Sequence, residues 1–312
     1  MKSAQIRRYG GSEVVEINQS TPAPKDPSAG KVLVDIRAAG INPADWKIRD
    51  GFFQQMMPLQ FPSTLGWDFS GVIEKVGESV SDFKQGDEVY GHAAEPAGGS
   101  GAFAEIALAK ADIIAHKPKT LNHQEAAGLP TVGVSAWQAL VETIRLTNGQ
   151  KILIHGGAGG IGSISIQLAK HLGAHVATTV SSHDIQFAKE LGADEVIDYK
   201  TQRFEDLVHD HDAVFDTVAG DTYSRSFKVL KRGGVIVSML EQPNQQLMEQ
   251  FGVKAIFQFT QVNRERLTKL AQWVDQNNIR VNVDRTFPLE EAGKALDYQK
   301  DVHPRGKVVL AI

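Results

Sequence analysis

One short segment, Lys151–Gly162, constrains the fold more than any other part of the chain: it reads KILIHGGAGGIG. Five residues of strand character lead into a glycine-rich turn with the spacing G-x-G-x-x-G, and apolar residues at helical spacing follow it. In such a unit the first glycine permits a tight turn, the second lets backbone approach a pyrophosphate, and the third lets the helix pack closely on the strand. The helix N-terminus then offers free N–H groups to the anion. We therefore predict a dinucleotide site made by Gly157, Ala158, Gly159, Gly160, Ile161 and Gly162.

The sequence around this turn supports the same interpretation. Between residues 151 and 259, six short runs rich in β-branched residues alternate with helical stretches, which is the pattern of parallel βαβ units. Six is also the number of strands in a complete dinucleotide-binding sheet. The runs are Lys151–His155, Val176–Val180, Glu195–Tyr199, Ala213–Val218, Val235–Leu240 and Val253–Phe259. These features predict an α/β fold with a doubly wound parallel sheet.

The residues before about Pro118 follow a different pattern. Short β-like runs are separated by glycine-rich breaks, which is typical of a small barrel or sandwich. The runs are Lys31–Ile36, Ser70–Val76, Glu88–Gly91, Ala102–Leu108 and Asp112–His116.

The C-terminal part of the chain begins with an amphipathic stretch, Arg264–Val274, that predicts a helix. A strand at Val281–Asp284, a turn at Phe287–Pro288 and a short helix at Leu289–Leu296 should follow, before a last strand at Lys307–Ile312. The last strands can return to the first domain. We therefore predict a first domain of residues 1–120, completed by residues 280–312, and a second domain of residues 121–279.

Composition excludes several classes of protein. The 312 residues are 42% hydrophobic, which is enough for two globular domains, and 33 basic against 37 acidic residues leave a net charge of −4, which argues against a nucleic-acid partner. We also expect no membrane partner and a cytoplasmic location, because no apolar stretch approaches the ~18 residues of a membrane span and no signal peptide is apparent. The absence of cysteine excludes disulfides, thiolate nucleophiles and cysteine-ligated metals.

The end of the second strand of the parallel sheet carries information on the cofactor. A site that prefers NAD usually offers an acidic side chain there to the ribose 2′-hydroxyl. This sequence has Ser181 and Ser182 instead, and their hydroxyls can donate to a 2′-phosphate. We therefore predict NADPH as the cofactor. The alternative role of the two serines is to cap the next helix.

Seven tracts, in this order along nearly the whole chain, resemble the medium-chain dehydrogenase/reductase superfamily. Within it, the resemblance is to the zinc-free quinone oxidoreductase, or zeta-crystallin-like, branch. The tracts are Ala39–Gly51, Leu65–Gly77, Gly86–Gly91, Gly101–Glu105, Leu129–Leu140, the glycine-rich turn and Gly306–Leu310.

The resemblance implies a GroES-like β-barrel catalytic domain beside a Rossmann domain. It implies reduction of a small-molecule quinone or α,β-unsaturated carbonyl by NADPH, and a homodimer formed through the last Rossmann strand, Val253–Phe259. Asn42 would lie beside the nicotinamide and the substrate, Ser135 would lie next to the cofactor, and Val218 would lie near the nicotinamide side. Two further cofactor contacts are predicted: Tyr199 near the adenosine phosphate and Arg305 at a 2′-phosphate.

The same resemblance implies that no metal is used. Where zinc-dependent relatives have a His-Glu pair, this chain has Trp67-Asp68, and a zinc site from Asp45, Asp68 and His92 alone is disfavoured. Without a Lewis acid, unactivated ketones become poor substrates. Quinones and α,β-unsaturated carbonyls remain suitable, because hydride addition places negative charge on an oxygen that a few hydrogen-bond donors can hold.

The catalytic candidates are Asn42, as a hydrogen-bond donor, and Asp45, which would hold Lys47 near the developing oxyanion. Apolar walls of the substrate site would be Trp46, Phe53 and Trp67. Many relatives have a tyrosine as a candidate acid near Phe53, but this chain has none, which favours quinones because their reduced product can take a proton from water. Two alternatives remain open: an enoyl-thioester reductase, and a non-catalytic NADPH-binding sensor or structural protein.

Overall fold

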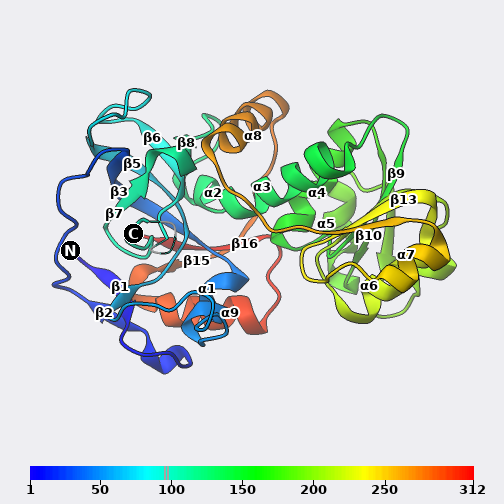
Figure 1. Ribbon diagram of the computed structural model, residues 1–312, viewed down its shortest axis with the longest axis horizontal. Coiled ribbons are helices and arrows are strands. Elements are labelled where there is room, and N and C mark those ends of the chain that lie inside the picture. Colours follow the sequence, from blue (N-terminus) through cyan, green and yellow to red (C-terminus); the bar gives the residue numbers. More distant parts are fainter. Residues whose placement is uncertain (95, 97) are drawn as a thin grey trace. The chain divides into compact units, whose positions relative to one another are not determined.

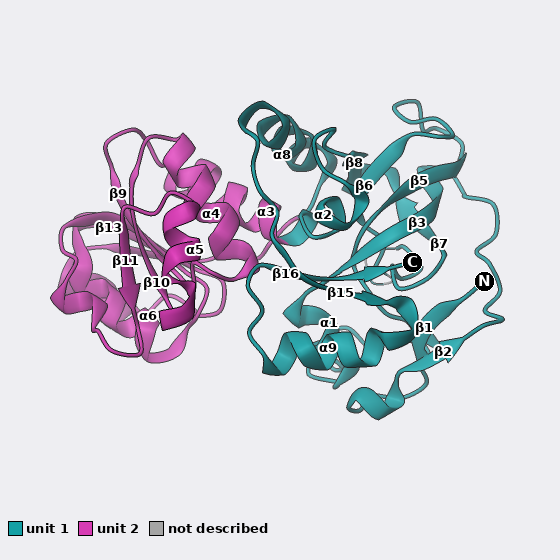
Figure 2. Cartoon of the chain, turned by 180° about the vertical axis from the view of Figure 1, so that it is seen from behind, with its two compact units in different colours: residues 1–131, 262–312 teal, residues 132–261 magenta. Residues whose placement is uncertain are grey.

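The computed structural model describes residues 1–94, 96 and 98–312. They form two compact units, unit 1 with residues 1–131 and 262–312 and unit 2 with residues 132–261 (Figures 1 and 2). Unit 2 is shorter at both ends than the predicted second domain, because residues 121–131 and 262–279 belong to unit 1. Among the described residues, no helix is long and apolar enough to cross a membrane.

Unit 2 contains a six-stranded sheet in which every neighbouring pair of strands is parallel. The strands lie in the order β11-β10-β9-β12-β13-β14. Numbered from 1 to 6 along unit 2, this order is 3-2-1-4-5-6, which is the Rossmann order. Each predicted run overlaps one of these strands, so the α/β, doubly wound fold is confirmed. The strands are β9 (Lys151–His155), β10 (His175–Val180), β11 (Glu195–Asp198), β12 (His211–Asp216), β13 (Leu230–Ser238) and β14 (Lys254–Phe257).

The central strands of unit 2 have apolar residues on both faces because helices cover both sides of such a sheet. Leu153, Ala177, Val214 and Ile236, from four neighbouring strands, are fully buried in one cluster. Complete burial of a Leu, Val or Ile side chain stabilises the fold by about 1.5–3 kcal/mol. The main helices of unit 2 are α4 (Gly160–His171), α5 (Ile185–Glu190), α6 (Gly220–Ser226) and α7 (Gln245–Phe251).

Unit 1 is built on a mainly antiparallel, seven-stranded sheet. Its strands are β3 (Lys31–Ile41), β5 (Asp68–Val76), β6 (Glu88–His92), β7 (Ile106–Lys110), β8 (Ile114–His116), β15 (Val283–Pro288) and β16 (Lys307–Ala311). A smaller sheet joins β1 (Ser3–Ile6), β2 (Glu16–Asn18) and β4 (Ser63–Thr64). Because β16 pairs with β3, the C-terminal strands lie in the same unit as the N-terminal ones.

Two predicted elements of unit 1 differ from the structure. The turn predicted at Phe287–Pro288 is the end of β15, which stays paired with β16 as far as Pro288 and Ala311. The strand predicted from Ala102 begins only at Ile106. A proline at the last position of an edge strand needs no ladder hydrogen bond, so it does not end the pairing early.

Contacts distant in sequence explain the shifted boundaries. Helix α8 (Arg264–Asn277) contacts unit 1: the Tyr90 hydroxyl donates to the Leu267 carbonyl at 2.7 Å, and Arg264 donates to the Ala111 carbonyl at 2.8 Å. Helix α2 (His123–Ala127) lies so close to β3 that a Cβ at Gly40 would be 2.2 Å from the Ala127 carbonyl. These helices therefore belong with the antiparallel sheet.

Candidate active site

The glycine-rich turn joins β9 to α4, and three of its glycines are required for separate steric reasons. Gly156 has φ of 71°, so the tight turn is made one residue before the position that the motif predicted. A Cβ at Gly157 would lie 2.1 Å from Thr178 Oγ1, so this glycine permits contact with β10. A Cβ at Gly162 would lie 2.2 Å from the Gly156 carbonyl oxygen, so this glycine permits the helix to pack on the turn.

Gly159 differs from the others because the protein itself does not require a glycine there. Its φ of −75° and ψ of 176° suit any residue, and a Cβ would meet only the Gly156 carbonyl oxygen, at 3.4 Å. Gly159 is also the N-cap of α4, and no side chain caps that helix end. Free N–H groups beside a surface without a side chain fit a pyrophosphate lying on the backbone, so these residues fit a dinucleotide.

Ser181 and Ser182, the two serines after β10, lie next to carboxylates. Ser181 Oγ donates to Asp184 at 2.6 Å, and Ser182 Oγ donates to Asp198 at 2.6 Å. The Ser182 hydroxyl is the main reason that the pKa of Asp198 lies below its usual value. The premise that acidic groups are missing here is therefore wrong, because the parallel pairing of β10 and β11 brings Asp198 to the end of the second strand.

Tyr199 lies at this same edge of the sheet. It follows β11, its N–H donates to the Val180 carbonyl at 3.1 Å, and its side chain is exposed. The structure thus brings together the three residues predicted for the adenosine end of the cofactor, namely Tyr199, Ser181 and Ser182. Lys200, which follows Tyr199, is a cation that acts on Asp198.

The loop after β12 is held by a buried carboxylate that sequence reasoning missed. Asp216 accepts the N–H groups of Val218 and Ala219, each at 3.0 Å, and its other oxygen accepts Ser238 Oγ at 2.7 Å. Ala219 has φ of 76° and ψ of −170°, a conformation that is nearly confined to glycine. Val218, predicted near the nicotinamide, is half exposed on this loop. The sequence signal that could have identified Asp216 is its place as an acidic residue at the end of an apolar strand.

Ser135 and Arg305 are the two other predicted cofactor contacts. Ser135 is buried in unit 2, where its hydroxyl is 2.7 Å from that of Thr260. Arg305 lies in unit 1 immediately before β16, and its carbonyl accepts the Asn282 side chain at 2.6 Å. Both contacts stay predictions.

In unit 1 the structure gathers a buried polar cluster from four distant segments. We call it the Asp68 cluster, and it consists of Asn42, Asp45, Asp68, His92 and Lys307. All five residues are at most 8% exposed. They come from the N-terminal end of α1 (Pro43–Arg49), from β5, from β6 and from β16. Lys307 and Asp68 are opposite charges within this one buried group.

Asp68 lies at the centre of the cluster and is fully paired. One oxygen is 2.7 Å from His92 Nε2 and accepts the Thr131 hydroxyl at 2.7 Å. The other accepts Asn42 Nδ2 at 3.0 Å and the Thr131 N–H at 3.1 Å. Burial pushes the pKa of Asp68 upward, but His92, Lys307 and Asn42 together hold the pKa below its usual value. Asp68 is therefore the ionised carboxylate of the cluster.

The amide of Asn42 is oriented by its two neighbours. Its Oδ1 accepts Lys307 Nζ at 2.5 Å, while its Nδ2 donates to Asp68. A lysine has no acceptor and a carboxylate has no donor, so the amide cannot be reversed. Among the described residues, the second N–H of Nδ2 has no acceptor. Hydrogen-bond donation, the role predicted for Asn42, therefore stays available for a ligand, whereas Oδ1 is occupied by Lys307.

Lys307, rather than Lys47, is the cation beside Asp45. Lys307 is buried and acts electrostatically on Asp45, and burial lowers its pKa. The Lys47 Nζ instead lies over the Trp46 ring, 5.5 Å from the centroid. The predicted Asp45–Lys47 pair is therefore wrong, because side chains two residues apart on a helix point to nearly opposite sides. The sequence signal that could have identified Lys307 is its place as the one charged residue in the apolar strand KVVLA.

The three predicted substrate residues lie in two places. The Trp67 ring contacts His92, with centroids 5.7 Å apart, and Trp67 shares a cavity of about 20 Å³ with Asp45. Trp46 instead packs edge-on against Phe52 and donates to Gln299 at 3.0 Å. Phe53 is half-buried in the segment after α1. Trp67 is thus the aromatic residue that accompanies the Asp68 cluster.

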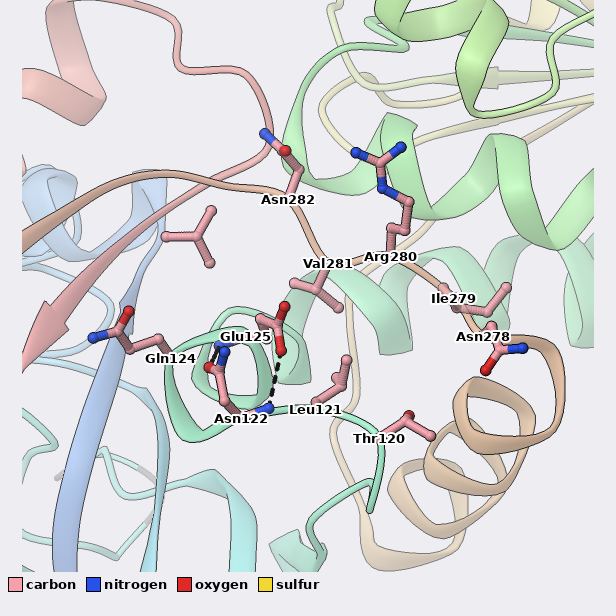
Figure 3. A pocket seen from close by; sticks show the side chains of 11 residues that line it. Thr120, Leu121, Asn122, Gln124, Glu125, Asn278, Ile279, Arg280, Val281 and Asn282 are labelled. Carbon is pink, nitrogen blue, oxygen red and sulfur yellow. Dashed lines mark hydrogen bonds between the residues drawn. The ribbon is translucent and has the colours of Figure 1, made fainter.

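A second cavity, of about 450 Å³, also belongs to unit 1 (Figure 3). None of the residues that line it is a predicted site residue. The Glu125 carboxylate there accepts the Asn122 N–H at 2.9 Å, which completes the N-terminal capping box of α2 (Figure 3). The lining consists of Thr120, Leu121, Asn122, Gln124, Glu125, Asn278, Ile279, Arg280, Val281, Asn282 and Val283. We assign no catalytic role to this cavity.

Within the described ranges of the chain, no three or more His, Cys, Asp or Glu side chains lie close enough together to hold a metal ion. His92 and Asp68 contact each other directly. Asp45, the third residue of the disfavoured zinc site, instead accepts the Asn42 N–H at 2.7 Å.

Comparison with known proteins agrees with this architecture. Residues 28–119 match the family model described as alcohol dehydrogenase GroES-like domain, which confirms the predicted GroES-like domain, and residues 191–310 match the model described as zinc-binding dehydrogenase. An NADPH-dependent alkenal/one oxidoreductase of chloroplasts from Arabidopsis thaliana is 34% identical, over 99% of this chain and 79% of the relative.

Two solved structures are similar over the whole chain. The quinone oxidoreductase from Coxiella burnetii has a TM-score of 0.90 and 35% identity, covering 100% of this chain and 99% of its own. The Escherichia coli quinone oxidoreductase complexed with NADPH has a TM-score of 0.89 and 28% identity, with complete coverage of both chains. The chain therefore belongs to the medium-chain dehydrogenase/reductase superfamily, in its zinc-free quinone oxidoreductase branch.

Proposed function

We propose that this protein is an NADPH-dependent oxidoreductase that transfers hydride to quinones or α,β-unsaturated carbonyls without a metal. The observation that carries the proposal is the fixed amide of Asn42 in the Asp68 cluster. Lys307 and Asp68 determine its orientation and leave one N–H to donate. Such a donor suits an oxygen that gains negative charge during reduction, because it needs no reorientation when the charge forms.

The chain supplies binding and electrostatic stabilisation around the reaction. When bound, the cofactor supplies the hydride. The turn at residues 156–162 and the N-terminus of α4 hold its pyrophosphate, since Gly159 leaves the backbone open. Asn42 donates to the enolate or phenolate oxygen of the product, and the buried charge of Lys307 behind its Oδ1 strengthens that N–H as a donor.

The preference for NADPH draws its support from the relatives that use it. Ser181 and Ser182 both donate to carboxylates in this structure, so a 2′-phosphate requires at least one of these hydroxyls to change its partner. Lys200 next to Tyr199 supplies a positive charge at this edge. We propose that Tyr199, Lys200 and the two serines receive the 2′-phosphate together.

We also propose that the chain forms a homodimer through β14. This strand is the last of the parallel sheet, so one of its edges pairs with no strand in the described part of the chain. Phe257 and Phe259 are exposed beside that edge, by 36% and 67%. An open edge with exposed aromatic residues favours pairing with a second copy. Phe259→Glu should convert a dimer to a monomer in light scattering, and an unchanged mass would refute this interface. The cytoplasmic location stays a prediction.

The decisive experiment follows the loss of NADPH or NADH absorbance with 1,4-benzoquinone, 9,10-phenanthrenequinone, 2-hexenal and an enoyl thioester, with a chelator present throughout. Turnover of a quinone or the enal with NADPH supports the proposal and identifies the better substrate class. Activity lost on chelation and restored by zinc refutes the metal-free mechanism. No turnover despite tight NADPH binding favours a sensor or structural role instead.

A further inference from the structure

Among the residues that the structure describes, Asp45 has a buried oxygen atom without a hydrogen-bond partner. Its Oδ2 accepts the Asn42 N–H at 2.7 Å, whereas its Oδ1 is inaccessible to solvent and unpaired. The side chain as a whole is 1% exposed. An ionised carboxylate in this position leaves charge on an unsolvated oxygen, which is strongly unfavourable. A neutral acid with its proton on Oδ1 needs only one acceptor.

A small cavity lies beside the Asp45 side chain. Its volume is about 20 Å³, which is enough for one water molecule. Besides Asp45 and Trp67, the hydroxyl-bearing residues Ser63 and Thr64 line it. The remaining lining residues are Ile48, Leu59, Leu65, Gly66 and Pro96.

The charges that face Asp45 are already balanced without it. Asp68, on β5, is ionised and paired with His92, and Lys307, on β16, provides one positive charge. Ionised Asp45 would be a second negative charge in a cluster with one lysine. Burial raises the pKa of Asp45 to about 7, and Asp68 adds to the rise, while the Asn42 N–H and Lys307 oppose it.

Of the other charged groups near α1, Lys47 lies over the Trp46 ring, and Arg49 and Asp50 are paired with groups of α9 (Ala292–Asp301). The helix α9 packs on α1, and its Asp297 and Lys300 pair with Arg49 and Asp50. Those side chains engage each other and do not neutralise Asp45. Lys307 is therefore the cation that faces it.

We propose that Asp45 is a positioning residue that acts as a proton-controlled switch through Asn42: its neutral form supports turnover, and its ionised form suppresses it. The inference rests on the proposed function. Asp45 contacts the backbone N–H of the residue whose side chain donates to the product oxygen. With Asp45 neutral, Lys307 offsets Asp68 and the site accepts a new oxyanion. With Asp45 ionised, the site contains an uncompensated negative charge that repels the oxyanion.

The first test compares the pH dependence of kcat in wild type and Asp45→Asn. In the wild type, kcat should fall as pH rises through about 7, approaching a tenfold loss per pH unit for one titrating group. Asparagine keeps an oxygen for the Asn42 N–H but cannot ionise, so this alkaline decline should disappear in the variant. The control Asp26→Asn removes an exposed carboxylate paired with Lys75 and should keep the wild-type profile.

The second test does not depend on activity or on the variant folding. In wild-type protein with ¹³C-labelled aspartate, the side-chain carboxyl NMR signals should include one that titrates near pH 7, far above an ordinary aspartate. Absence of any such titration overturns the inference. Turnover with the same alkaline decline in Asp45→Asn also overturns it and leaves the proposed function standing. If no acceptor is reduced at any pH, the proposed function fails, and the NMR titration alone decides whether Asp45 holds a proton.

Discussion

The glycine-rich turn of unit 2 and the Asp68 cluster of unit 1 are both candidate functional regions, but they are built in opposite ways. The turn lies within seven consecutive residues, and most of its requirements are steric. The cluster joins residues as far apart as Asn42 and Lys307, and its requirement is a balance of buried charge. A substitution in the turn can therefore remove binding alone, whereas a substitution in the cluster should damage stability and activity together.

The largest effect is expected from Lys307→Met. The change leaves Asp68 buried without its lysine and frees the Asn42 amide, so the free energy of unfolding should fall by about 3–5 kcal/mol. Chemical denaturation measures the loss. The control Lys294→Met breaks an exposed ion pair with Glu291 and should cost less than about 1 kcal/mol. Equal stabilities for the two variants would show that the buried charge balance does not support unit 1.

A pair of turn variants separates packing from binding. Gly157→Ala places a methyl group against Thr178 and should lower stability by about 1–3 kcal/mol. Gly159→Ala has room in the protein and should change stability by less than about 0.5 kcal/mol, yet it should weaken NADPH binding because the methyl group occupies the place of the pyrophosphate. Denaturation and calorimetry measure the two effects. Unchanged NADPH affinity in Gly159→Ala would mean that the pyrophosphate lies elsewhere.

The difference between the turn and the Asp68 cluster also decides what the sequence could predict. The parallel sheet and its turn were predictable, because hydrophobic runs and glycine spacing reflect local geometry. Asn42 was identified through its tract. Lys307 was not, although it lies in the tract Gly306–Leu310, because the sequence does not show the register in which β16 pairs with β3 and brings Lys307 to Asn42. Asp216 and Asp198 were missed for the same reason: a carboxylate at the end of a strand gains its partners only when the neighbouring strands assemble.

The two units should also respond to pH in opposite directions. The pKa of Asp45 is raised to about 7, so the folded state holds a proton that the unfolded state releases, and stability falls as pH rises from about 4 to 7. Burial lowers the pKa of His155, in unit 2, to about 3, so the unfolded state binds the proton, and stability falls as pH drops below about 6.5.

Each of these two groups changes the stability by about 1.4 kcal/mol per pH unit, and between about pH 4 and 6.5 the effects oppose each other. Asp45→Asn should therefore make stability rise more steeply with pH in that window, and His155→Gln should make it rise less steeply. Denaturation at several pH values measures both slopes. Slopes that stay equal to the wild type would show that neither group has the shifted pKa.

The smallest effect concerns the loop after β12. Unlike the glycine-rich turn, this loop has a conformation that the local sequence does not predict. Ala219 adopts a conformation that costs a non-glycine residue about 1–3 kcal/mol, and nothing in its sequence signals this. Ala219→Gly removes that strain but adds about 0.5–1 kcal/mol of backbone entropy cost, so stability should rise by up to about 1 kcal/mol. Gly220→Ala is the matched reverse change: its φ of 63° should make alanine cost about 1–2 kcal/mol. If Ala219→Gly instead destabilises the protein, the hydrogen bonds that the Val218 and Ala219 N–H groups donate to Asp216 hold this loop without strain. A buried charge would then organise a part of unit 2, as it does in unit 1.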